Sequence, residues 1–462
     1  MIRVPHAPGR PVAVLGLGKA GLAAAKALAA SGAEVWAWDD DPAKRGGLPT
    51  MDLARVDWSK PSALILSPGI PHRFPKPHPV AARAAAAGCP IIGEVELLFR
   101  AQPKARYVGI TGTNGKSTTT ALIGHLARQA GRKVEVGANL GTPALALQPL
   151  AEDGIYVLEM SSYQLELMES GHFDVAVLLN ITPDHLERHG GMAGYIAAKR
   201  RIFDRQHGHD WAVIGVDDDP SRTIHHSLAG RRIAAITIGR QHLGLITVES
   251  GIMRDEQGRT IMDLAAAHAL PGPHNWQNAA AAFAVARALG ISEADTVAGI
   301  ESYPGLPHRQ ELVATAKGIA FVNDSKATNA DATAKALACY QPIYWILGGR
   351  AKETGLDGLE PFYPRIAHAF LIGEASERFA ATLEGHVGYT KCGTLAAALS
   401  AAHRQAQAEH KAGAVVLLSP ACASFDQFAN FEERGNVFRA LVEALFVTPA
   451  EANAGAARRR VQ

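Results

Sequence analysis

The stretch Tyr107–Gly124, YVGITGTNGKSTTTALIG, constrains the fold of this chain more than any other. Val108–Ile110 is a short apolar run of the kind found in buried parallel strands, and Thr111–Gly115 is a turn rich in glycine. A segment with helical spacing of apolar residues follows and stops at Gly131. A strand, a glycine loop and a helix in this order aim backbone N–H groups at one spot, so the stretch predicts an α/β fold with an anion site.

Two polar side chains make this anion site suitable for a nucleotide. Lys116 adds a positive charge, and Ser117 can ligate a phosphate-bound Mg²⁺. The loop departs from the standard Walker A pattern, because Ile110 stands where that pattern has its first glycine. Nucleotide binding is still expected in spite of this departure, but the departure argues against a generic P-loop ATPase. An ordinary glycine turn before a helix is the alternative.

Composition limits the class of protein. A chain of 462 residues predicts two to four domains, and 47% hydrophobic with 19% charged residues fits a globular protein in water. A formal net charge of +2 is too small for general nucleic-acid binding, and the basic Arg458–Arg460 is expected to lie in a frayed tail. No stretch is apolar for long enough to span a membrane, and the first residues do not resemble a secretory signal.

The four cysteines show neither metal-ligand spacing nor the density of a disulfide scaffold, which predicts a reducing, cytosolic environment. They are Cys89, Cys339, Cys392 and Cys422.

The N-terminal region resembles a dinucleotide-binding fingerprint. Strand Val12–Leu15 leads into the glycine loop Gly16–Gly21 and a helix over Leu22–Ala30, and strand Glu34–Trp38 ends in Asp39–Asp41. The glycines allow a pyrophosphate to approach, and an acidic residue about twenty positions on can bind a ribose hydroxyl. The same geometry suits any nucleotide-linked substrate, and Asp39–Asp41 is equally compatible with a solvated turn.

Further candidates follow the ends of predicted strands, where α/β sheets bind their ligands. Glu159 follows Ile155–Leu158 and can ligate the Mg²⁺ of a nucleotide. His185 follows strand Val175–Asn180, and Asp184 beside it can orient or pair with the imidazole. A surface Glu and an ordinary His are the alternatives. Another strand end precedes Ser67-Pro68-Gly69-Ile70, which is also compatible with a plain turn.

Two more polar positions lie on predicted helices. Lys199 shares a helix with Ile202 and Phe203, and its sequence context alone predicts a surface lysine. Asn275 opens an Ala-rich helix, where it fits an N-cap or a contact to a ligand's base.

The C-terminal region predicts a second doubly wound sheet. The segment Gly305–Arg309 reads as a linker into a new unit. Four apolar runs then end in small and polar residues, with helical stretches between them. These runs are Ile319–Val322, Ile343–Leu347, Ala369–Ile372 and Val415–Leu418. Lys326 and Lys352 follow two of the runs and can together hold a dicarboxylate.

Long motifs in the right order over nearly the whole chain resemble the Mur ligases, and among them the branch that adds D-glutamate. The motif of the diaminopimelate-adding branch, Asp-Asn-Pro-Arg, does not occur. The matching segments are Gly112–Ser117, Leu158–Glu166, Asn180–Leu186, His274–Asn278, Asn323–Asn329 and Ser419–Phe428.

The resemblance implies three α/β domains. These are a Rossmann-like domain that binds a UDP-sugar (1–93), a central P-loop-type ATPase domain with a mostly parallel sheet (94–304), and a Rossmann-like, doubly wound domain that binds the amino acid (305–462). It implies an ATP-dependent ligase that joins D-glutamate to UDP-N-acetylmuramoyl-L-alanine through an acyl phosphate, in the cytoplasmic synthesis of peptidoglycan precursors. A monomer with these small-molecule substrates is expected.

The resemblance also implies roles for individual residues. Ser117 and Glu159 would bind one Mg²⁺, and His185 and Lys199 a second, with a CO₂-derived carbamate on Lys199; Lys116 joins Glu159, His185 and Lys199 as catalytic residues. The ATP site would comprise Gly112, Thr113, Asn114, Gly115, Lys116, Ser117, Thr118, Asn275, Asn278, Arg309 and Asp324. The UDP-substrate site would comprise Gly18, Lys19, Ala20, Asp39, Asp40, Ser67, Gly69 and Asn139. The glutamate site would comprise Lys326, Thr328, Lys352, Ser424, Phe425 and Phe431.

Three rival functions fit parts of the sequence. A nicotinamide dehydrogenase would use Gly16–Gly21 and Asp39 but leaves the phosphate loop unexplained. A binding protein without catalysis would only hold a UDP-sugar, and a ligase for L-glutamate would share every motif. Relatives carry a hydroxyl where this chain has Ala20, so a contact at that position would come from the backbone or be absent.

Overall fold

The chain is described here from a computed structural model, which covers residues 2–228, 230, 232–239, 245–351 and 355–446. It divides into two compact units, Met1–Tyr303 and Pro304–Gln462, called below the first and the second unit. The division falls just before the predicted linker Gly305–Arg309. Lys352, the cluster Arg458–Arg460 and the rest of the tail lie outside the described residues. Among the described residues, no helix is long and apolar enough to cross a membrane.

The N-terminal part of the first unit is built on a parallel sheet in the order β2-β1-β3-β4. Alternate residues of β1 face different cores: Val12 and Val14 pack into one, Ala13 and Leu15 into the other. Both faces are therefore buried, which explains why the strand is apolar throughout. Its elements are β1 (Val12–Leu15), α1 (Lys19–Ala30), β2 (Val35–Trp38), β3 (Leu64–Leu66), α2 (Pro79–Ala86), β4 (Ile91–Ile92) and α3 (Glu94–Ala101).

A nine-stranded sheet forms the rest of the first unit, in the order β13-β12-β11-β10-β9-β8-β5-β7-β6. The strands from β6 to β11 pair in parallel, whereas β12 and β13 pair antiparallel at one edge. The strands are β5 (Arg106–Thr111), β6 (Val134–Ala138), β7 (Ile155–Glu159), β8 (Val175–Leu178), β9 (Trp211–Gly215), β10 (Arg232–Ile238), β11 (Ile246–Glu249), β12 (Ile252–Asp255) and β13 (Thr260–Asp263).

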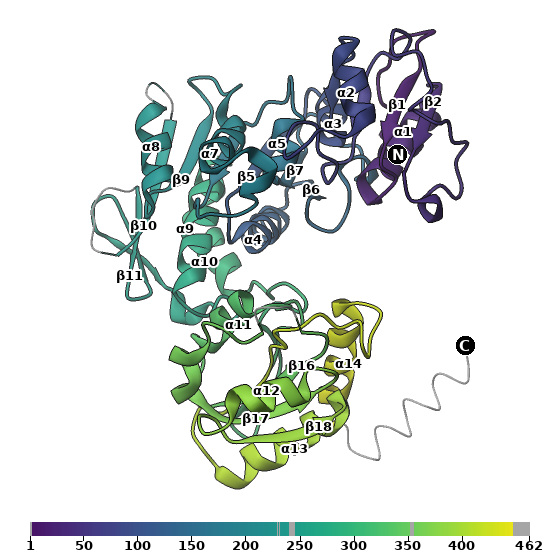
Figure 1. Cartoon of the computed structure of the whole chain (residues 1–462). Coiled ribbons are helices and arrows are strands. Elements are labelled where there is room, and N and C mark those ends of the chain that lie inside the picture. Colours follow the sequence, from purple (N-terminus) through teal and green to yellow (C-terminus); the bar gives the residue numbers. More distant parts are fainter. Residues whose placement is uncertain (1, 229, 231, 240–244, 352–354, 447–462) are drawn as a thin grey trace, which may run out of the picture. The chain divides into compact units, whose positions relative to one another are not determined.

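Helices cover both faces of this sheet (Figure 1). On one face α4 and α9 pack against each other over Val157, Val177 and Val213. On the other face Tyr195 of α7 and Phe203 pack with the alternate strand residues into a core that continues to the N-terminal sheet. The helices are α4 (Lys116–Gln129), α5 (Ser162–Glu166), α6 (Leu186–His189), α7 (Met192–Arg200), α8 (Asp219–Ser227), α9 (Pro273–Ala288) and α10 (Glu293–Glu301).

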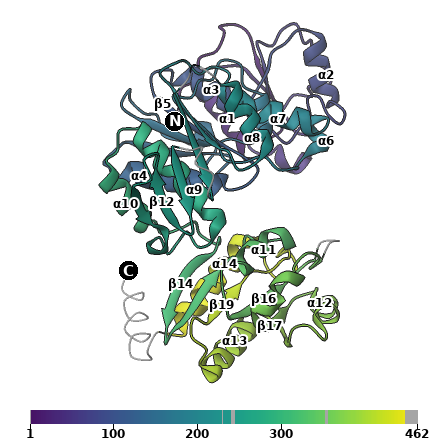
Figure 2. The same ribbon diagram turned by 90° about the vertical axis from the view of Figure 1, so that its left-hand side faces the viewer.

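The second unit is a six-stranded sheet in the order β14-β15-β19-β16-β17-β18, parallel except for the β14–β15 hairpin. One face packs against α11 and α12, and the other against α13 and α14 (Figure 2). The elements are β14 (Glu311–Ala316), β15 (Ile319–Asn323), α11 (Ala330–Leu337), β16 (Ile343–Gly348), β17 (Ile366–Ile372), α12 (Ser376–Leu383), β18 (Tyr389–Gly393), α13 (Leu395–Glu409), β19 (Val415–Leu418) and α14 (Phe431–Ala444).

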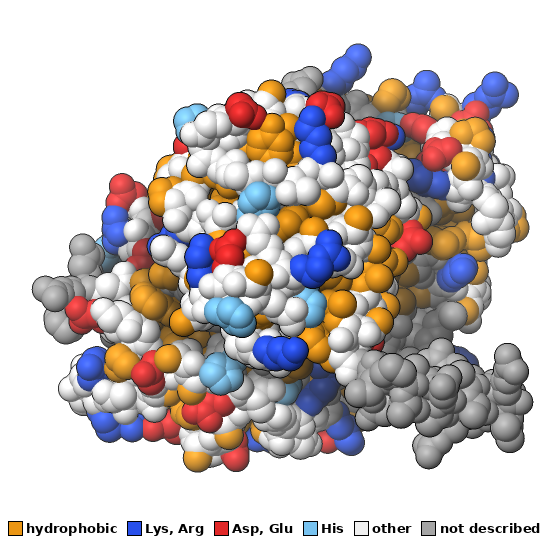
Figure 3. Space-filling model, turned by 90° about the horizontal axis from the view of Figure 1, so that it is seen from below, with side chains coloured by type: hydrophobic (Ala, Val, Ile, Leu, Met, Phe, Trp, Pro, Cys, Tyr) orange, Lys and Arg blue, Asp and Glu red, His pale blue; other side chains and the backbone are white. Residues whose placement is uncertain are grey.

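The predicted class, α/β with mostly parallel sheets and a doubly wound C-terminal unit, is confirmed. Predicted strands Val12–Leu15 and Val415–Leu418 keep their bounds, Val175–Asn180 ends two residues earlier at Leu178, and Ala369–Ile372 begins three residues earlier at Ile366. The structure also adds an antiparallel edge to the two larger sheets. One helix prediction is wrong in detail: α7 ends at Arg200, and Ile202 and Phe203 belong to the 3₁₀ turn Arg201–Phe203. The boundary at 93/94 stays a prediction. Acidic and basic side chains are interspersed on the face shown in Figure 3, as the small net charge leads one to expect.

Candidate active site

The predicted phosphate loop connects β5 to α4. The helix begins at Lys116, directly after Gly115, whose φ is +86°. A Cβ at Gly115 would lie 2.2 Å from Oδ1 of Asn278 on α9, so both the conformation and the close approach require glycine here. The helix N-terminus is thus held against α9 with its free N–H groups at the end of the strand, which is the geometry of an anion site.

A second segment, the one that follows β8, fixes the shape of this loop. The Asn180 side chain accepts from the backbone N–H of Asn114 (2.9 Å), and the Thr113 backbone N–H donates to the Asn180 carbonyl (2.8 Å). The Thr113 hydroxyl donates to the Thr182 carbonyl (3.0 Å) and contacts the Tyr195 hydroxyl (3.1 Å). The motif that contains His185 is therefore bound directly to the phosphate loop.

Two lysines converge on one carbonyl of the loop. Nζ of Lys116 and Nζ of Lys199 donate to the Gly112 carbonyl at 2.9 and 2.7 Å. Lys199 is only 1% exposed, so the sequence-based expectation of a surface lysine is wrong. Burial, and next the charge of Lys116, lower the pKa of Lys199 to about 6. At neutral pH its amine is mainly uncharged, which makes it a nucleophile.

Glu159 ends β7, beside β5 in the sheet, where its Cα pairs with that of Ile110. The residue is 2% exposed. Oε1 accepts from the Asn139 side chain at 2.6 Å, whereas Oε2 is buried without a hydrogen-bond partner. A buried carboxylate oxygen without a partner is costly, and a bound cation would remove that cost. Glu159 and the hydroxyl of Ser117, on the first turn of α4, are oxygen ligands of the type that Mg²⁺ prefers.

His185 lies at the start of α6, with a left-handed φ of +51° and a side chain that is 49% exposed. Its Nε2 is 3.5 Å from the Asp184 carboxylate, as the sequence suggested. Asp184 and Glu159 both raise the pKa of Lys199 electrostatically, in opposition to its burial. The structure therefore brings Asp184, His185, Glu159 and Lys199 to one end of the sheet. Within the described residues, no three His, Cys, Asp or Glu side chains form a metal-ligating group.

The two predicted ATP-site asparagines on α9 serve the packing of that helix. The helix begins at Pro273 with Gly272 at the N-cap, so the predicted N-cap at Asn275 is wrong. The Asn275 side chain donates to the Pro271 carbonyl (2.7 Å) and accepts from the Asn278 amide (2.9 Å). Oδ1 of Asn278 in turn accepts from the Thr119 hydroxyl of α4 (3.1 Å). Pro fits the first helical turn because it has no N–H to satisfy.

A cavity of about 480 Å³ opens at the carboxyl ends of β1, β2 and β3. It is lined by seven of the eight predicted UDP-substrate residues, and the eighth, Asn139, lies instead against Glu159. The seven are Gly18, Lys19, Ala20, Asp39, Asp40, Ser67 and Gly69.

Close packing and a hydrogen bond fix the conformation of the glycine loop that lines this cavity. A Cβ at Gly21 would lie 1.8 Å from the Gly16 carbonyl, so α1 can approach the strand only with glycine at this position. Oδ2 of Asp39 accepts from the Leu17 backbone N–H (2.6 Å). Asp39 therefore fixes the conformation of the glycine loop, a role that the sequence analysis did not predict for it. Asp40 binds His78 at 2.8 Å, and this hydrogen bond is the main cause that lowers the pKa of Asp40.

The remaining ATP-site predictions, Arg309 and Asp324, belong to the second unit. Asp324 is buried at the end of β15, where Oδ2 accepts from the Ser419 hydroxyl (2.7 Å) and Oδ1 from the Gln310 backbone N–H (3.1 Å). Burial raises its pKa to about 7 in spite of these bonds and of the charge of Arg309. The Nε of Arg309 is buried without a hydrogen-bond partner.

The predicted glutamate residues lie on three segments of the second unit. Nζ of Lys326 lies 5.7 Å from the ring centre of Phe431, the first residue of α14. Thr328 follows in the same loop and donates its N–H to the Lys326 carbonyl (2.9 Å). Ser424 is buried and Phe425 is 63% exposed, both after β19. Lys352, the remaining predicted glutamate-site residue, lies outside the described residues.

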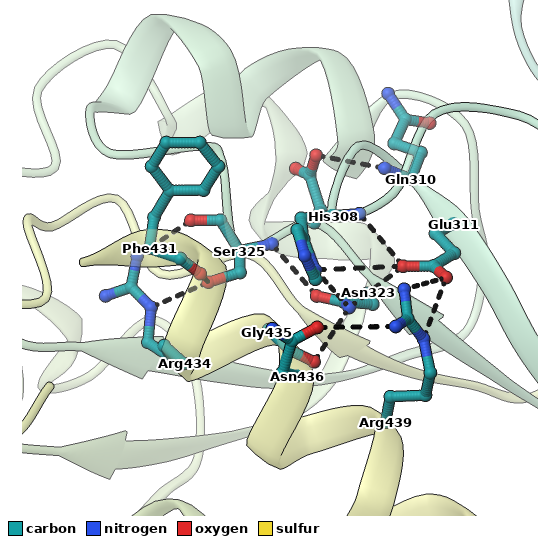
Figure 4. A network of polar contacts seen from close by, with 11 residues as sticks. His308, Gln310, Glu311, Asn323, Ser325, Phe431, Arg434, Gly435, Asn436 and Arg439 are labelled. Atoms are coloured by element: carbon teal, nitrogen blue, oxygen red, sulfur yellow. Dashed lines mark hydrogen bonds and ion pairs between the residues drawn. The ribbon is translucent and has the colours of Figure 1, made fainter. Parts of the chain in front are cut away.

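A polar network that the sequence analysis missed supports these segments (Figure 4). The buried guanidinium of Arg434 donates to the hydroxyl and carbonyl of Ser325 (2.9 and 2.8 Å) and to the Cys422 carbonyl (3.1 Å). It therefore ties the Lys326 loop to the Ser424 loop. The Asn323 side chain likewise contacts His308 and donates to the Gly435 carbonyl. Arg434 could have been found, because it precedes Phe438 by one helical turn on the apolar face of α14.

Two family models together match most of the chain. The model of the Mur ligase middle domain matches residues 110–286, and that of the Mur ligase glutamate ligase domain matches residues 308–422. A UDP-N-acetylmuramoylalanine–D-glutamate ligase from Paramagnetospirillum magneticum is 53% identical over 96% of this chain and 98% of its own length. The chain belongs to the Mur ligase family. A Rhodospirillum rubrum ligase of the same name is 51% identical over 97% of this chain and 98% of its own.

Solved Mur ligase structures share the fold at low identity. A UDP-N-acetylmuramate–alanine ligase from Thermotoga maritima has a TM-score of 0.57 at 15% identity and covers 94% of this chain and 99% of its own. A UDP-N-acetylmuramoyl-L-alanyl-D-glutamate–2,6-diaminopimelate ligase has a TM-score of 0.58 at 20% identity and covers 80% of this chain and 90% of its own. The family models and the relatives about 50% identical over nearly the whole chain confirm the resemblance to Mur ligases and the prediction of a ligase, and the dehydrogenase alternative is wrong.

Proposed function

We propose that this Mur ligase joins D-glutamate to UDP-N-acetylmuramoyl-L-alanine with ATP, in the cytoplasmic synthesis of peptidoglycan precursors. The observation that carries the proposal is the group at the phosphate loop. There Lys116 and Lys199 share the Gly112 carbonyl, and Glu159 keeps one buried oxygen without a partner. Relatives about 50% identical bear the name of this D-glutamate ligase.

The two nucleotides would occupy different ends of the first unit. The uridine diphosphate would lie in the cavity at Gly18 and Gly69, and the ATP phosphates on the loop Gly112–Ser117. Loop N–H groups and Thr118 would hold the ATP phosphates, and Asn275 and Asn278 would face its base. Lys326, Thr328, Lys352, Ser424, Phe425 and Phe431 would receive the amino acid.

The metal ligands follow from the chemistry of the donor set. Ser117 and Glu159 would bind one Mg²⁺, and His185 with Lys199 a second. A buried, uncharged Lys199 amine can add CO₂, and the resulting carbamate would supply an anionic oxygen ligand for Mg²⁺ that the amine lacks. The Mg²⁺ ions would screen the negative charge that the carboxylate and the transferred phosphoryl group bring together.

The reaction needs an activated acid, because a carboxylate is a poor electrophile. The alanyl carboxylate would attack the γ-phosphorus of ATP, forming an acyl phosphate and releasing ADP, with Lys116 against the charge of the phosphoryl oxygens. The D-glutamate amine would then attack the acyl carbon, lose a proton and expel phosphate. His185, half exposed and beside Asp184, would orient or deprotonate that amine.

The proposal extends to the organisation of the chain. We propose three functional domains, 1–93, 94–304 and 305–462, in a monomer. Because Arg309 and Asp324 of the second unit would complete the ATP site, the second unit would close on the first during turnover.

An assay with both glutamate enantiomers tests the proposal. Purified protein with ATP, Mg²⁺ and UDP-N-acetylmuramoyl-L-alanine should release phosphate and form the UDP-linked dipeptide product with D-glutamate and not with L-glutamate. Lys116→Ala should abolish both signals, whereas Lys133→Ala, which alters an exposed lysine paired with Asp153, should not. Substrate-dependent phosphate release by Lys116→Ala would contradict the mechanism, and equal use of L-glutamate would contradict the specificity.

A further inference from the structure

A single helical turn, α6, lies between the nucleotide cavity and the phosphate loop. It contains four residues, Leu186–His189, and is flanked by left-handed residues on both sides, His185 (φ +51°) and Gly190 (φ +69°). A turn this short is not stable by itself, because helix nucleation is unfavourable. Side-chain contacts must therefore fix the position of α6 and, with it, of His185.

The ring of Tyr163, on α5, is the centre of these contacts. The ring centres of His185 and His189 lie 5.2 and 5.4 Å from it, and the His189 ring is nearly parallel to it (19°). The guanidinium carbon of Arg188 lies 4.6 Å from the centre of the same ring. His185, directly before the turn, and Arg188 and His189 within it thus contact one aromatic ring.

His189 anchors the turn to the central domain. It is buried, its Nε2 lies 2.9 Å from the Ser162 hydroxyl, and its Nδ1 lies 3.1 Å from the Glu166 carboxylate. Both partners belong to α5, the helix that follows Glu159 in the chain. This side of α6 is therefore fixed relative to the phosphate loop.

Arg188 reaches in the other direction, to the loop between β3 and α2. Nη1 donates to the Gly69 carbonyl at 2.8 Å and Nη2 to the Pro68 carbonyl at 3.4 Å. Both residues line the nucleotide cavity. The Nε of Arg188 is buried without a hydrogen-bond partner, so the side chain is not optimised for stability alone.

A second contact joins the same two segments. The ring of Phe74, in the same loop, packs so closely on Gly190 that a Cβ there would lie 3.0 Å from it. The loop between β3 and α2 thus contacts both Arg188 in α6 and Gly190 directly after it.

We propose that Arg188 is a positioning residue that transmits occupancy of the nucleotide cavity to His185. The inference rests on the proposed function, since it takes the cavity as the site of the UDP-linked substrate. Arginine suits the role because its planar fork donates to two successive carbonyls while its flat face stacks on a ring; lysine offers neither property. Substrate binding at one end of the unit would thereby complete the catalytic end.

Hydrogen exchange tests the coupling without any turnover. Backbone amides of residues 185–190 are followed by mass spectrometry before and after UDP-N-acetylmuramoyl-L-alanine is added, with ATP and Mg²⁺ absent, and calorimetry records binding of the same ligand. The variants are Arg188→Met and Arg188→Lys. Arg205→Met is the matched control, because Arg205 also donates to a backbone carbonyl, that of Glu169, at 2.8 Å.

In the wild type and in Arg205→Met, the ligand should slow exchange over residues 185–190. In both Arg188 variants the ligand should still bind, but this protection should be absent. In a separate assay with ATP, Mg²⁺ and D-glutamate, kcat of these variants should fall about tenfold or more, because a displaced catalytic group lowers the rate. Equal protection in wild type and Arg188→Lys would overturn the inference, as would its loss in Arg205→Met. Failure of the wild type to bind the ligand would instead overturn the proposed function.

Discussion

Replacing Lys199 by methionine should stabilise the protein while it abolishes ligation. Lys199 is buried, and burial together with the charge of Lys116 lowers its pKa from the ordinary 10.5 to about 6. At neutral pH the native amine is uncharged, whereas the same lysine in the unfolded chain is protonated. The unfolded state therefore binds more protons, and the native state loses stability as the pH falls from 10.5 towards 6.

The size of this effect follows from the pKa difference. A pH of about 7.5 is roughly three units below the ordinary lysine pKa. At about 1.36 kcal/mol per unit, deprotonating the lysine on folding therefore costs about 4 kcal/mol of stability. Methionine has a similar length and no charge, but it loses the 2.7 Å hydrogen bond to the Gly112 carbonyl. That loss costs about 1 kcal/mol, so we expect a net gain of about 3 kcal/mol.

Urea unfolding of Lys199→Met and wild type, in buffer depleted of CO₂, measures this gain. The difference in free energy of unfolding should shrink as the pH is raised towards 10 and grow as it is lowered towards 6. Bicarbonate should raise the stability of the wild type alone if Lys199 forms a carbamate. Lys133→Met, at an exposed lysine, should show none of these effects. A less stable Lys199→Met, or a difference that ignores pH, would refute the argument.

Three further predictions concern the loop and the second unit. Gly115→Ala should weaken ATP binding at least tenfold in calorimetry, because its Cβ would clash at 2.2 Å, whereas Gly131→Ala, with open space around its Cβ, should not. Arg434→Met leaves the Ser325 and Cys422 carbonyls without a donor and should lower the free energy of unfolding of the second unit by about 3 kcal/mol in urea titrations. Asp324→Asn should gain stability relative to wild type as the pH rises from about 4 to 7, since the raised pKa makes the native carboxyl bind more protons than the unfolded one; a flat difference between the two curves would contradict this.

Several buried parallel strands could be predicted because each is a continuous apolar run, whereas β9, the middle strand of the nine-stranded sheet, and its parallel neighbour β10 were not predicted. Val12–Leu15, Leu64–Leu66 and Val415–Leu418 have the predicted bounds. The antiparallel strands β12 and β14 were missed. Their sequences, Ile-Met-Arg-Asp and Glu-Leu-Val-Ala-Thr-Ala, show neither a continuous apolar run nor strict alternation, and they contain charged residues such as Arg254 and Glu311.

The sequence predicted which residues belong to the candidate site, but not their distances, burial or hydrogen-bond partners. Strand ends placed Glu159 and His185 at one edge of the sheet, because parallel strands end there together. Burial of Lys199 could not be read from its helix, since a lysine at such spacing usually faces water. The N-cap at Asn275 was misjudged because Gly272 and Pro273, three and two residues earlier, already start the helix.

The resting contacts of Lys116 have a consequence for which molecules the loop admits. Its ammonium group is already satisfied by the Gly112 and Thr113 carbonyls, both at 2.9 Å. An incoming group must compete with two amide oxygens, and a phosphate, with its full negative charge, can do so where a nucleoside or sugar hydroxyl gains nothing. The loop therefore selects ligands first by their negative charge, and a nucleoside without phosphate groups should bind to it only weakly.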